Sequence, residues 1–442
     1  MKKIILFVLI LSCLAFTFVG CKGDGDVEET TAATTVDPNH AHEWGEVEVT
    51  EAPDCRYAGE GKKTCALCGA VEKVEIPALG HDVPTSSYVD NPTFTRGGVA
   101  SGVCTRCEKK IRSDAPALKK EYVAISANIA SVNNVYFNGF WTNTQNGAFT
   151  NMLGSEVMAK VKGASKVTYT FEVSDTTKSA VVAYTTDGIN WTRQDLKTSA
   201  TLTVTVPADE TVVRVMFVDT ALDMAQAGTG ITLKSVAADK GTVAPCAKKG
   251  INVLVISDNV TDIEKDVFTL AAESLGVNAY RMSRKGFGYE SLSAFLENYA
   301  AEGNTTAVNP AYIMISLGEN EANLAGNIFM VAISDVMNAL MEAYAETDIL
   351  LVKPESGAKA GMLDTIASYH GCVSIVETSE WATAEDINEK SEMLEKTLVD
   401  IYGEKVYFDG YYEKYTAPDV STFPNDKTGN GSYGELKPME KV

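Results

Sequence analysis

Residues 251–262 read Ile-Asn-Val-Leu-Val-Ile-Ser-Asp-Asn-Val-Thr-Asp. An apolar run of strand length ends here in small polar residues and passes into an amphipathic pattern. In an open parallel α/β sheet, ligands and catalytic groups lie at such a corner between a strand and the following helix. The corner Ser257-Asp258-Asn259 is therefore the expected centre of a functional site.

The chain around this corner alternates apolar and amphipathic segments, which predicts a three-layer α/β/α domain at 251–412 with a parallel, flavodoxin-like sheet and right-handed crossovers. Strands are expected at 251–257, 277–282, 311–317, 348–353, 372–377 and 405–408. Helices are expected at 262–275, 290–302, 323–346, 359–369 and 384–402, and Gly276 and Gly303 fall where helix C-caps belong. The remaining 413–442 are expected to form a loosely held tail.

The corner resembles the first block of the SGNH (GDSL) hydrolase family, in which a strand ends in Gly-Asp-Ser and the serine is the nucleophile. Asn259 stands at the serine position. The family's second block supplies a glycine amide to an oxyanion, and Gly286 or Gly288 fits it. The third block, Gly-x-Asn-Asp, resembles Gly318-Glu319-Asn320-Glu321, with Asn320 at the position that completes the oxyanion hole.

The last block of the family, Asp-x-x-His, resembles Asp386-Ile387-Asn388-Glu389, with Glu389 where the histidine base belongs. Acyl transfer by this route needs a hydroxyl nucleophile and a base within hydrogen-bond reach. The domain's only histidine, His370, precedes an expected strand and so lies at the amino edge of the sheet. The resemblance therefore implies a catalytically degenerate SGNH esterase-like domain.

Two functions remain open for this domain. The first is binding or scaffolding of a glycan, such as a cell-wall or dietary polysaccharide, through hydrogen-bonding groups that include Asp258, Asn259 and Asn320. Alternatively, the domain is an active carbohydrate esterase or hydrolase in which a carboxylate such as Asp386, Glu389 or Glu319 acts as base toward a water molecule.

Residues 121–240 contain period-two apolar runs at 167–173, 180–184, 201–206 and 212–218, which predict an antiparallel β-sandwich. The stretch from Tyr184 to Trp191 resembles a hairpin common in carbohydrate-associated β domains. The order of domains resembles that of SGNH carbohydrate esterases with a preceding jelly-roll domain. Trp141 would stack on a sugar ring if exposed, and a buried core tryptophan is the alternative. Residues 239–250, with Cys246, are expected to be a linker.

An internal repeat with a spacing of 39 residues precedes the sandwich. Its two copies are the segments 40–80 and 81–120. His42, Cys55, Cys65 and Cys68 recur as His81, Phe94, Cys104 and Cys107. The segments resemble Cys/His repeats near the membrane end of exported Gram-positive proteins. Units of about 40 residues need a metal ion or disulfides to supplement a small core.

Metal and disulfide are both possible in these repeats. Structural zinc in the first repeat would use the ligand set His42, Cys55, Cys65 and Cys68. His81 could serve either repeat, whereas the second repeat keeps Cys104 and Cys107 but has Phe94 in the third cysteine position. A disulfide from Cys55 to Cys65 or Cys68 is the alternative in an oxidising compartment. No catalytic cofactor is expected.

The first 20 residues combine Lys2-Lys3 with an apolar run at 4–18, and Phe18-Val19-Gly20-Cys21 resembles the lipobox of bacterial lipoproteins. This resemblance implies a signal peptide over residues 1–20 and a lipid on Cys21. Residues 21–39 would be a tether that holds the protein on the extracellular face of the cytoplasmic membrane. The whole chain of 442 residues has a formal net charge of −21, which argues against binding to nucleic acid. The sequence leaves the oligomeric state open.

Overall fold

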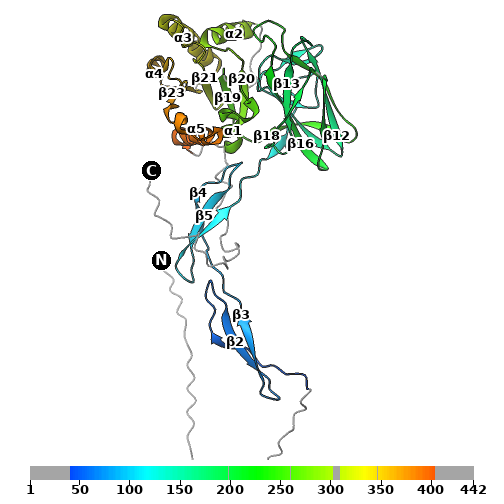
Figure 1. The fold of residues 1–442 in the computed structure, drawn as a ribbon, viewed down its shortest axis with the longest axis vertical. Coiled ribbons are helices and arrows are strands. Elements are labelled where there is room, and N and C mark those ends of the chain that lie inside the picture. The colour runs from blue at the N-terminus through cyan, green and yellow to red at the C-terminus, as the bar shows by residue number, and fades with distance from the viewer. Residues whose placement is uncertain (1–39, 198, 259, 302–308, 346, 404–442) are drawn as a thin grey trace, which may run out of the picture. The chain divides into compact units, whose positions relative to one another are not determined.

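The computed structural model describes residues 40–197, 199–258, 260–301, 309–345 and 347–403. The chain divides into two compact units, Met1–Leu79 and Gly80–Val442 (Figure 1). The expected signal peptide, the lipid site Cys21, the tether, the strand at 405–408 and the tail at 413–442 lie outside the described residues. Within the described residues, no helix has the length and apolar character needed to cross a bilayer.

The first unit contains a three-stranded antiparallel sheet with the order β1-β2-β3. Its strands are β1 Glu48–Glu51, β2 Gly59–Thr64 and β3 Val71–Ile76. The second unit begins with a sheet of the same order, made of β4 Ser86–Asp90, β5 Gly98–Val103 and β6 Lys110–Ala115. Because β5 and β6 start and end 39 residues after β2 and β3, the sequence repeat is also a structural repeat.

Glycine recurs at the first residue of the middle strand because the backbone passes too close for a side chain. A Cβ atom on Gly59 would lie 2.3 Å from the carbonyl oxygen of Glu51. A Cβ atom on Gly98 would lie 2.3 Å from the carbonyl oxygen of Asp90. The matched glycines of the repeat therefore have a steric cause.

The C-terminal part of the second unit is built on a five-stranded parallel sheet with the order β20-β19-β21-β22-β23. Its strands are β19 Asn252–Ser257, β20 Asn278–Ser283, β21 Tyr312–Ser316, β22 Asp348–Val352 and β23 Val373–Val376. Counted along the chain, this order is 2-1-3-4-5, the flavodoxin-like arrangement whose direction reverses between β19 and β21. The predicted parallel α/β sheet is thus present.

Helices cover both faces of the parallel sheet (Figure 1). They are η1 Ile263–Lys265, α1 Val267–Leu275, α2 Tyr289–Ala301, α3 Gly326–Ala343, α4 Ala360–Tyr369, η2 Ser379–Thr383 and α5 Ile387–Tyr402. Leu254 and Ile256 of β19 pack with α2, α3 and α4, whereas Val253 and Val255 pack with α1 and α5. A strand buried on both faces is continuously apolar, which is why this run was readable in the sequence.

The helix expected at 262–275 is divided into η1 and α1. Asp266, in an extended conformation between them, accepts a hydrogen bond from the backbone N–H of Thr269 and caps α1. Gly276 ends α1 with a φ of 71°, as the sequence predicted. Gly303 lies outside the described residues.

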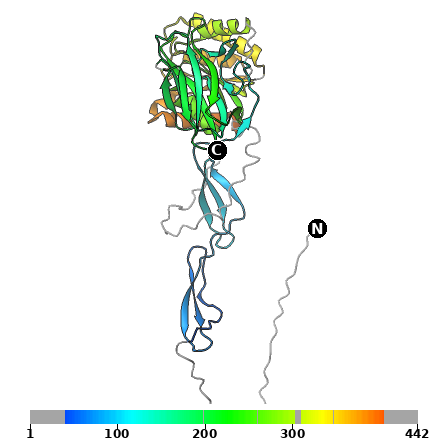
Figure 2. The ribbon, with the colours of Figure 1, turned by 90° about the vertical axis from the view of Figure 1, so that its right-hand side faces the viewer.

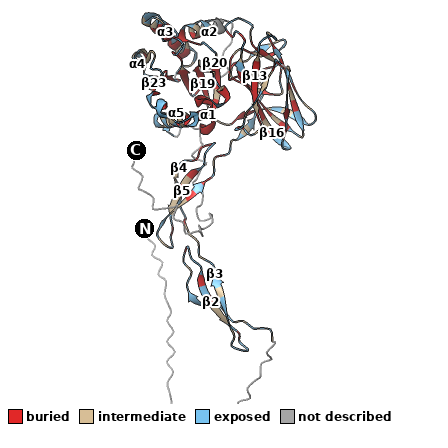
Figure 3. Ribbon diagram, viewed as in Figure 1, coloured by how far each residue is buried: buried red, intermediate tan, exposed pale blue. Residues whose placement is uncertain are grey.

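In the chain, the residues between the second Cys/His repeat and the parallel sheet form a β-sandwich of two antiparallel sheets (Figure 2). One sheet has the order β15-β12-β17-β10-β9, the other β14-β13-β16-β11-β18-β7 with β8 paired to β11. The strands are β7 Tyr122–Ala124, β8 Tyr136–Asn138, β9 Thr142–Thr144, β10 Gly147–Thr150, β11 Glu156–Lys162, β12 Lys166–Val173, β13 Ala180–Thr185, β14 Thr192–Asp195, β15 Thr201–Thr205, β16 Glu210–Thr220, β17 Ile231–Ala238 and β18 Thr242–Lys248. Alternate residues of β12 and β15 are buried, whereas β11 and β16 are buried along most of their length (Figure 3).

The segment 239–250, expected to be a linker, instead contains strand β18. β18 pairs with β11 through residues 242–245 and with β7 through residues 246–248. Cys246 is fully buried beside Met158. The sandwich therefore passes into the parallel domain with no intervening linker.

Buried ionic side chains join the sandwich to the parallel domain. Glu273 of α1 lies 2.9 Å from both Arg214 of β16 and Lys248 of β18, and it also pairs with Lys120. Arg214 pairs in addition with Glu156 of β11. All of these side chains except that of Lys120 are at least nine-tenths buried, so the carboxylates and the cations depend on one another for compensation.

Candidate functional site

The candidate site lies at the carboxyl edge of the parallel sheet, where β19 and β21 diverge. Asp258 directly follows β19, and Gly318 to Glu321 follow β21. The Asn320 side chain donates a hydrogen bond to Oδ2 of Asp258 at 2.9 Å. These two blocks of the SGNH resemblance therefore meet at the point where open α/β sheets bind ligands. Asn259 lies outside the described residues.

Both N–H groups of the Asn320 side chain are already used. One points to Asp258, and the other is donated to the carbonyl oxygen of Phe287 at 3.1 Å. A side-chain amide has two N–H donors, so Asn320 keeps only its oxygen for further hydrogen bonds, and that oxygen is an acceptor. In this arrangement Asn320 cannot complete an oxyanion hole, the role that the resemblance implied.

Gly288, one of the two glycines expected to supply the second oxyanion donor, is engaged as well. The backbone N–H of Gly288 is donated to the hydroxyl of Ser291 at 3.0 Å. A Cβ atom on Gly288 would lie 2.6 Å from the carboxyl carbon of Glu321, so a glycine here lets the Glu321 side chain approach the loop. Glu321 is buried, and its Oε2 has no hydrogen-bond partner within the described residues.

The edge of the sheet carries negative charge. Burial raises the pKa of Asp258 to about 6, the charges of Glu319 and Glu321 act in the same direction, and backbone N–H groups oppose them only in part. Glu319 is held by the backbone N–H and the hydroxyl of Ser356, at 3.1 and 2.7 Å. A negative potential of this kind disfavours the developing oxyanion of acyl transfer.

Asp258→Asn is expected to raise the free energy of unfolding at pH 7 by about 1–2 kcal/mol. The pKa of Asp258 in the folded state lies above its unfolded value, so ionisation costs stability. This cost is absent below about pH 4, grows between about pH 4 and 6, and stays constant above. Raising the pKa of Asp258 from about 4 to about 6 would cost about 3 kcal/mol, and solvent screening of the part-exposed carboxylate reduces this cost.

Urea unfolding at pH 4 and pH 7 measures this effect. Asp335→Asn, at an exposed position of α3, is the matched control and should change stability by less than about 0.5 kcal/mol at either pH. An Asp258→Asn variant that is equally stabilised at both pH values would contradict the assignment.

The last block of the resemblance caps a helix. Asp386 is the N-cap of α5, and its Oδ1 accepts hydrogen bonds from the backbone N–H groups of Asn388 and Glu389. The Glu389 carboxylate accepts the backbone N–H of Glu385. Backbone hydrogen bonding from Glu389 is the main cause that holds the pKa of Asp386 below its ordinary value. A general base works best with a pKa near the operating pH, so the lowered pKa of Asp386 does not suit that role. The Glu389 carboxylate completes the cap of the helix.

His370 ends α4 just before β23, at the amino edge of the sheet, as the sequence predicted. Trp141 is half-buried, its indole N–H is donated to the carbonyl oxygen of Asn138, and its ring packs edge-on against Phe137. Trp141 therefore packs against the sandwich core from its border, neither exposed nor within the core.

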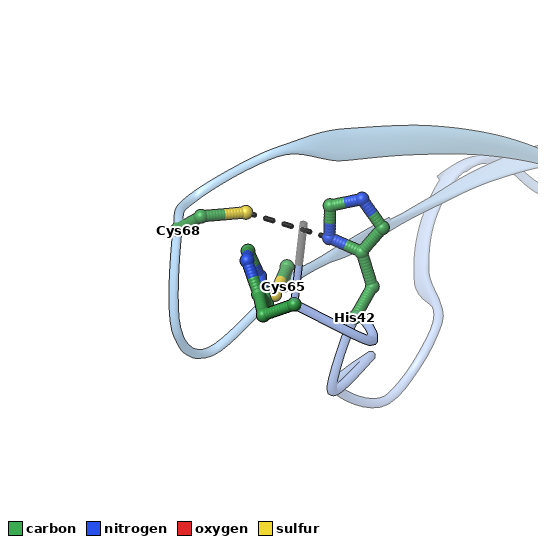
Figure 4. A group of neighbouring side chains, drawn as sticks. His42, Cys65 and Cys68 are labelled. Carbon is green, nitrogen blue, oxygen red and sulfur yellow. Dashed lines mark hydrogen bonds between the residues drawn. The ribbon is translucent and has the colours of Figure 1, made fainter. Parts of the chain in front are cut away.

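A second candidate site is a Cys/His group in the first unit. Ligand atoms of His40, His42, Cys65 and Cys68 all lie within 4.8 Å of one another. Figure 4 shows the His42 ring directed toward Cys68, with Sγ of Cys68 3.4 Å from Nδ1 of His42. Cys65 and Cys68 are thiols. Burial alone would raise the pKa of Cys65, but hydrogen bonding to His40 and other groups lowers it to about 5.

The group differs from the predicted ligand set in one member, since His40 takes the place of Cys55. The six residues of β2 separate Cys55 from Cys65, and an extended strand of that length spans about 20 Å. The first repeat can therefore hold a metal ion, with a ligand that spacing alone did not identify.

In the second repeat, His81, Cys104 and Cys107 lie within 4.8 Å of one another. Sγ of Cys107 is 3.6 Å from Nδ1 of His81, the same pair of atoms that approach each other in the first repeat. His81 therefore lies beside a cysteine of its own repeat.

No protein-family model matches the sequence, and no curated protein matches it. Among solved structures, the chain is similar to a family two carbohydrate esterase from Clostridium thermocellum in complex with cellohexaose. Identity is 14%, the TM-score is 0.48, and 61% of this chain and 99% of that chain are covered.

An acetyl xylan esterase from the rumen bacterium Butyrivibrio proteoclasticus shows 16% identity and a TM-score of 0.48, over 65% of this chain and 98% of that chain. A member of the lipolytic G-D-S-L family from Veillonella parvula shows 11% identity and a TM-score of 0.27, over 34% of this chain and 97% of that chain. Similarity at this level leaves activity to be argued from the residues of this chain.

Proposed function

We propose that this chain is a cell-surface glycan-binding protein in which an SGNH-like domain, preceded by a jelly-roll-like sandwich, binds polysaccharide without cleaving it. The observation that carries the proposal is the hydrogen bonding of Asn320. Both of its donors are committed to Asp258 and Phe287, so the edge of the sheet offers acceptors where an esterase needs donors.

Acceptor groups at this edge suit the hydroxyl groups of a sugar. Asp258 and the side-chain oxygen of Asn320 accept from O–H donors, and hydrogen bonds to a charged acceptor are the stronger kind. Asp258, Glu319 and Glu321 together repel anionic ligands. The preferred ligand is therefore a neutral polysaccharide rather than one rich in uronate.

We place the protein on the extracellular face of a bacterial cytoplasmic membrane, held by a lipid on Cys21. The support is the basic, apolar and Cys21-containing pattern at the start of the sequence.

We also assign a structural role, and zinc as the ion, to a metal in the first Cys/His repeat. Thiolate and imidazole ligands together suit zinc. The candidate ligands in the first repeat are histidines and cysteines, and none of the carboxylates at the edge of the parallel sheet is among them.

Asn320→Ala is expected to weaken binding to neutral polysaccharide about 10-fold, because it removes a ligand contact and frees the Asp258 carboxylate to move. Affinity electrophoresis against neutral and uronate-rich polysaccharides measures the effect. Asn338→Ala, at an exposed position of α3, is the control and should bind like the wild type. Equal binding by both variants would contradict the site.

Turnover of p-nitrophenyl acetate and acetylated xylan tests the competing hydrolase function. The wild-type chain should show none above buffer. Turnover that disappears in Glu389→Ala would overturn the binding proposal and establish carboxylate-based hydrolysis.

A further inference from the structure

The interatomic distances in the first Cys/His repeat match a tetrahedral metal site. With bonds of about 2.3 Å to sulfur and 2.05 Å to nitrogen, a tetrahedral zinc ion holds its sulfur and nitrogen ligands about 3.6 Å apart. Sγ of Cys65 lies 3.6 Å from Nε2 of His40, and Sγ of Cys68 lies 3.4 Å from Nδ1 of His42.

We propose that His40, His42, Cys65 and Cys68 are the four ligands of one zinc ion, and that Cys55 is not a ligand of this site. The inference rests on the structural metal proposed for the first repeat. It goes further by fixing the ligand set as two histidines and two cysteines.

Two backbone features present these ligands. Cys65 accepts a hydrogen bond from the backbone N–H of Gly69 at 3.0 Å and donates its own N–H to Ala70 at 2.8 Å, and Gly69 has a φ of 72°. This tight turn directs both cysteine side chains to one side. The β-bridge between Trp44 and Cys65 brings the segment that contains the histidines beside the turn (Figure 4).

His40 and His42 are two residues apart in the chain, and their ring centroids lie 4.9 Å from each other. The His42 ring is further positioned by Trp44, whose ring centroid is 4.8 Å away. The two imidazoles thus approach the cysteine turn from one segment, as a chelating pair.

The first repeat needs the stabilisation of a bound metal ion, because it buries almost no apolar side chains. Among residues 40–79, the only buried apolar side chains are those of Cys55 and Cys65. Val49, Tyr57 and Val71 are all more than half exposed. A unit of this size without a core depends on a metal or a crosslink, and metal binding then supplies its folding free energy.

The test uses the full chain carrying Cys104→Ser and Cys107→Ser, so that metal binding reports on the first repeat. Titration with Co²⁺ should give one ion per chain, with the visible spectrum of a tetrahedral site and a thiolate charge-transfer band. Competition with Zn²⁺ then gives the affinity.

In this background, His40→Ala is expected to weaken metal binding more than about 100-fold, since even a residue that only supports a ligand contributes 10–100-fold. Cys55→Ser should change the affinity less than about 2-fold. His40→Cys restores a ligand and should recover binding with a stronger thiolate band, which separates ligation from misfolding.

The outcomes distinguish the proposals. Loss of binding in Cys55→Ser with none in His40→Ala would overturn the ligand set and leave a structural metal. Absence of any bound ion would overturn both. Neither result bears on polysaccharide binding, which Asn320→Ala tests separately.

Discussion

Replacing Glu273 with Gln is expected to lower the free energy of unfolding of the second unit by about 3–5 kcal/mol, the usual cost of breaking a buried ion pair from one side. Glu273 is fully enclosed and pairs with Arg214, Lys248 and Lys120. Glutamine keeps the shape but leaves three cations at the junction between the sandwich and α1 with only Glu156 as a counter-charge.

The pH dependence of this effect has a definite sign. Burial alone would raise the pKa of Glu273, but Arg214, Lys248 and Lys120 outweigh it and hold the pKa well below its ordinary value. A depressed folded-state pKa contributes stability above the unfolded value of about 4.3, and this contribution is lost as the pH falls. The difference in the free energy of unfolding between wild type and Glu273→Gln should be largest at pH 7 and should shrink below about pH 4.

Urea unfolding of the wild-type and variant chains at pH 7 and below about pH 4 measures this difference in free energy. Asp400→Asn is the control, because Asp400 pairs with Lys396 at 3.5 Å on the exposed side of α5. An exposed pair one helical turn apart contributes about 0.3–0.5 kcal/mol. A loss of that small size in Glu273→Gln would show that the buried network does not hold the two domains together.

The parallel domain was predictable because its strands are continuously apolar. The five described strands fall within a residue of their expected segments, since strands covered on both faces leave little room for polar residues. β18 was missed because Thr242–Lys248 carries a proline, a cysteine and a lysine, a composition typical of linkers. Its burial comes from β11, β7 and α1, partners distant in sequence.

The candidate sites were predictable in place but not in detail. The meeting of Asp258 with Asn320 follows from topology, because parallel strands end at a common edge. The hydrogen bonds of the Asn320 amide depend on the carbonyl group of Phe287. Every residue type has the same backbone carbonyl, so the sequence does not reveal this contact. In the first repeat, the pattern His40-Ala41-His42 was a usable signal for a chelating pair.

Phe94 shows how the second repeat departs from the first. It occupies the position of Cys55, and its backbone N–H is donated to the carbonyl oxygen of Ser274 at 2.9 Å. Its buried ring packs with Leu118 and the α1 side of the parallel sheet. A Cβ atom on Gly276 would lie 2.2 Å from this ring, so the glycine that ends α1 also makes room for Phe94.

Phe94→Ala is therefore expected to lower the free energy of unfolding by about 3 kcal/mol, at the lower end for a core phenylalanine because the site lies at a domain junction. Loosening the junction should also increase protease cleavage within 81–120 before the parallel domain unfolds. Phe94→Leu, which keeps most of the apolar volume, should cost less than about 1.5 kcal/mol and leave the cleavage pattern unchanged.

Urea unfolding and limited proteolysis of the two variants separate two roles for this position. If Phe94 only fills space within its own three-stranded sheet, Phe94→Ala should accelerate cleavage there without changing the stability of the parallel domain. If it docks the repeat on α1, both measurements change together. The hydrogen bond to Ser274 and the contact with Gly276 favour docking, because neither partner belongs to the repeat. The phenylalanine at this position of the repeat thus serves to anchor the repeat on α1.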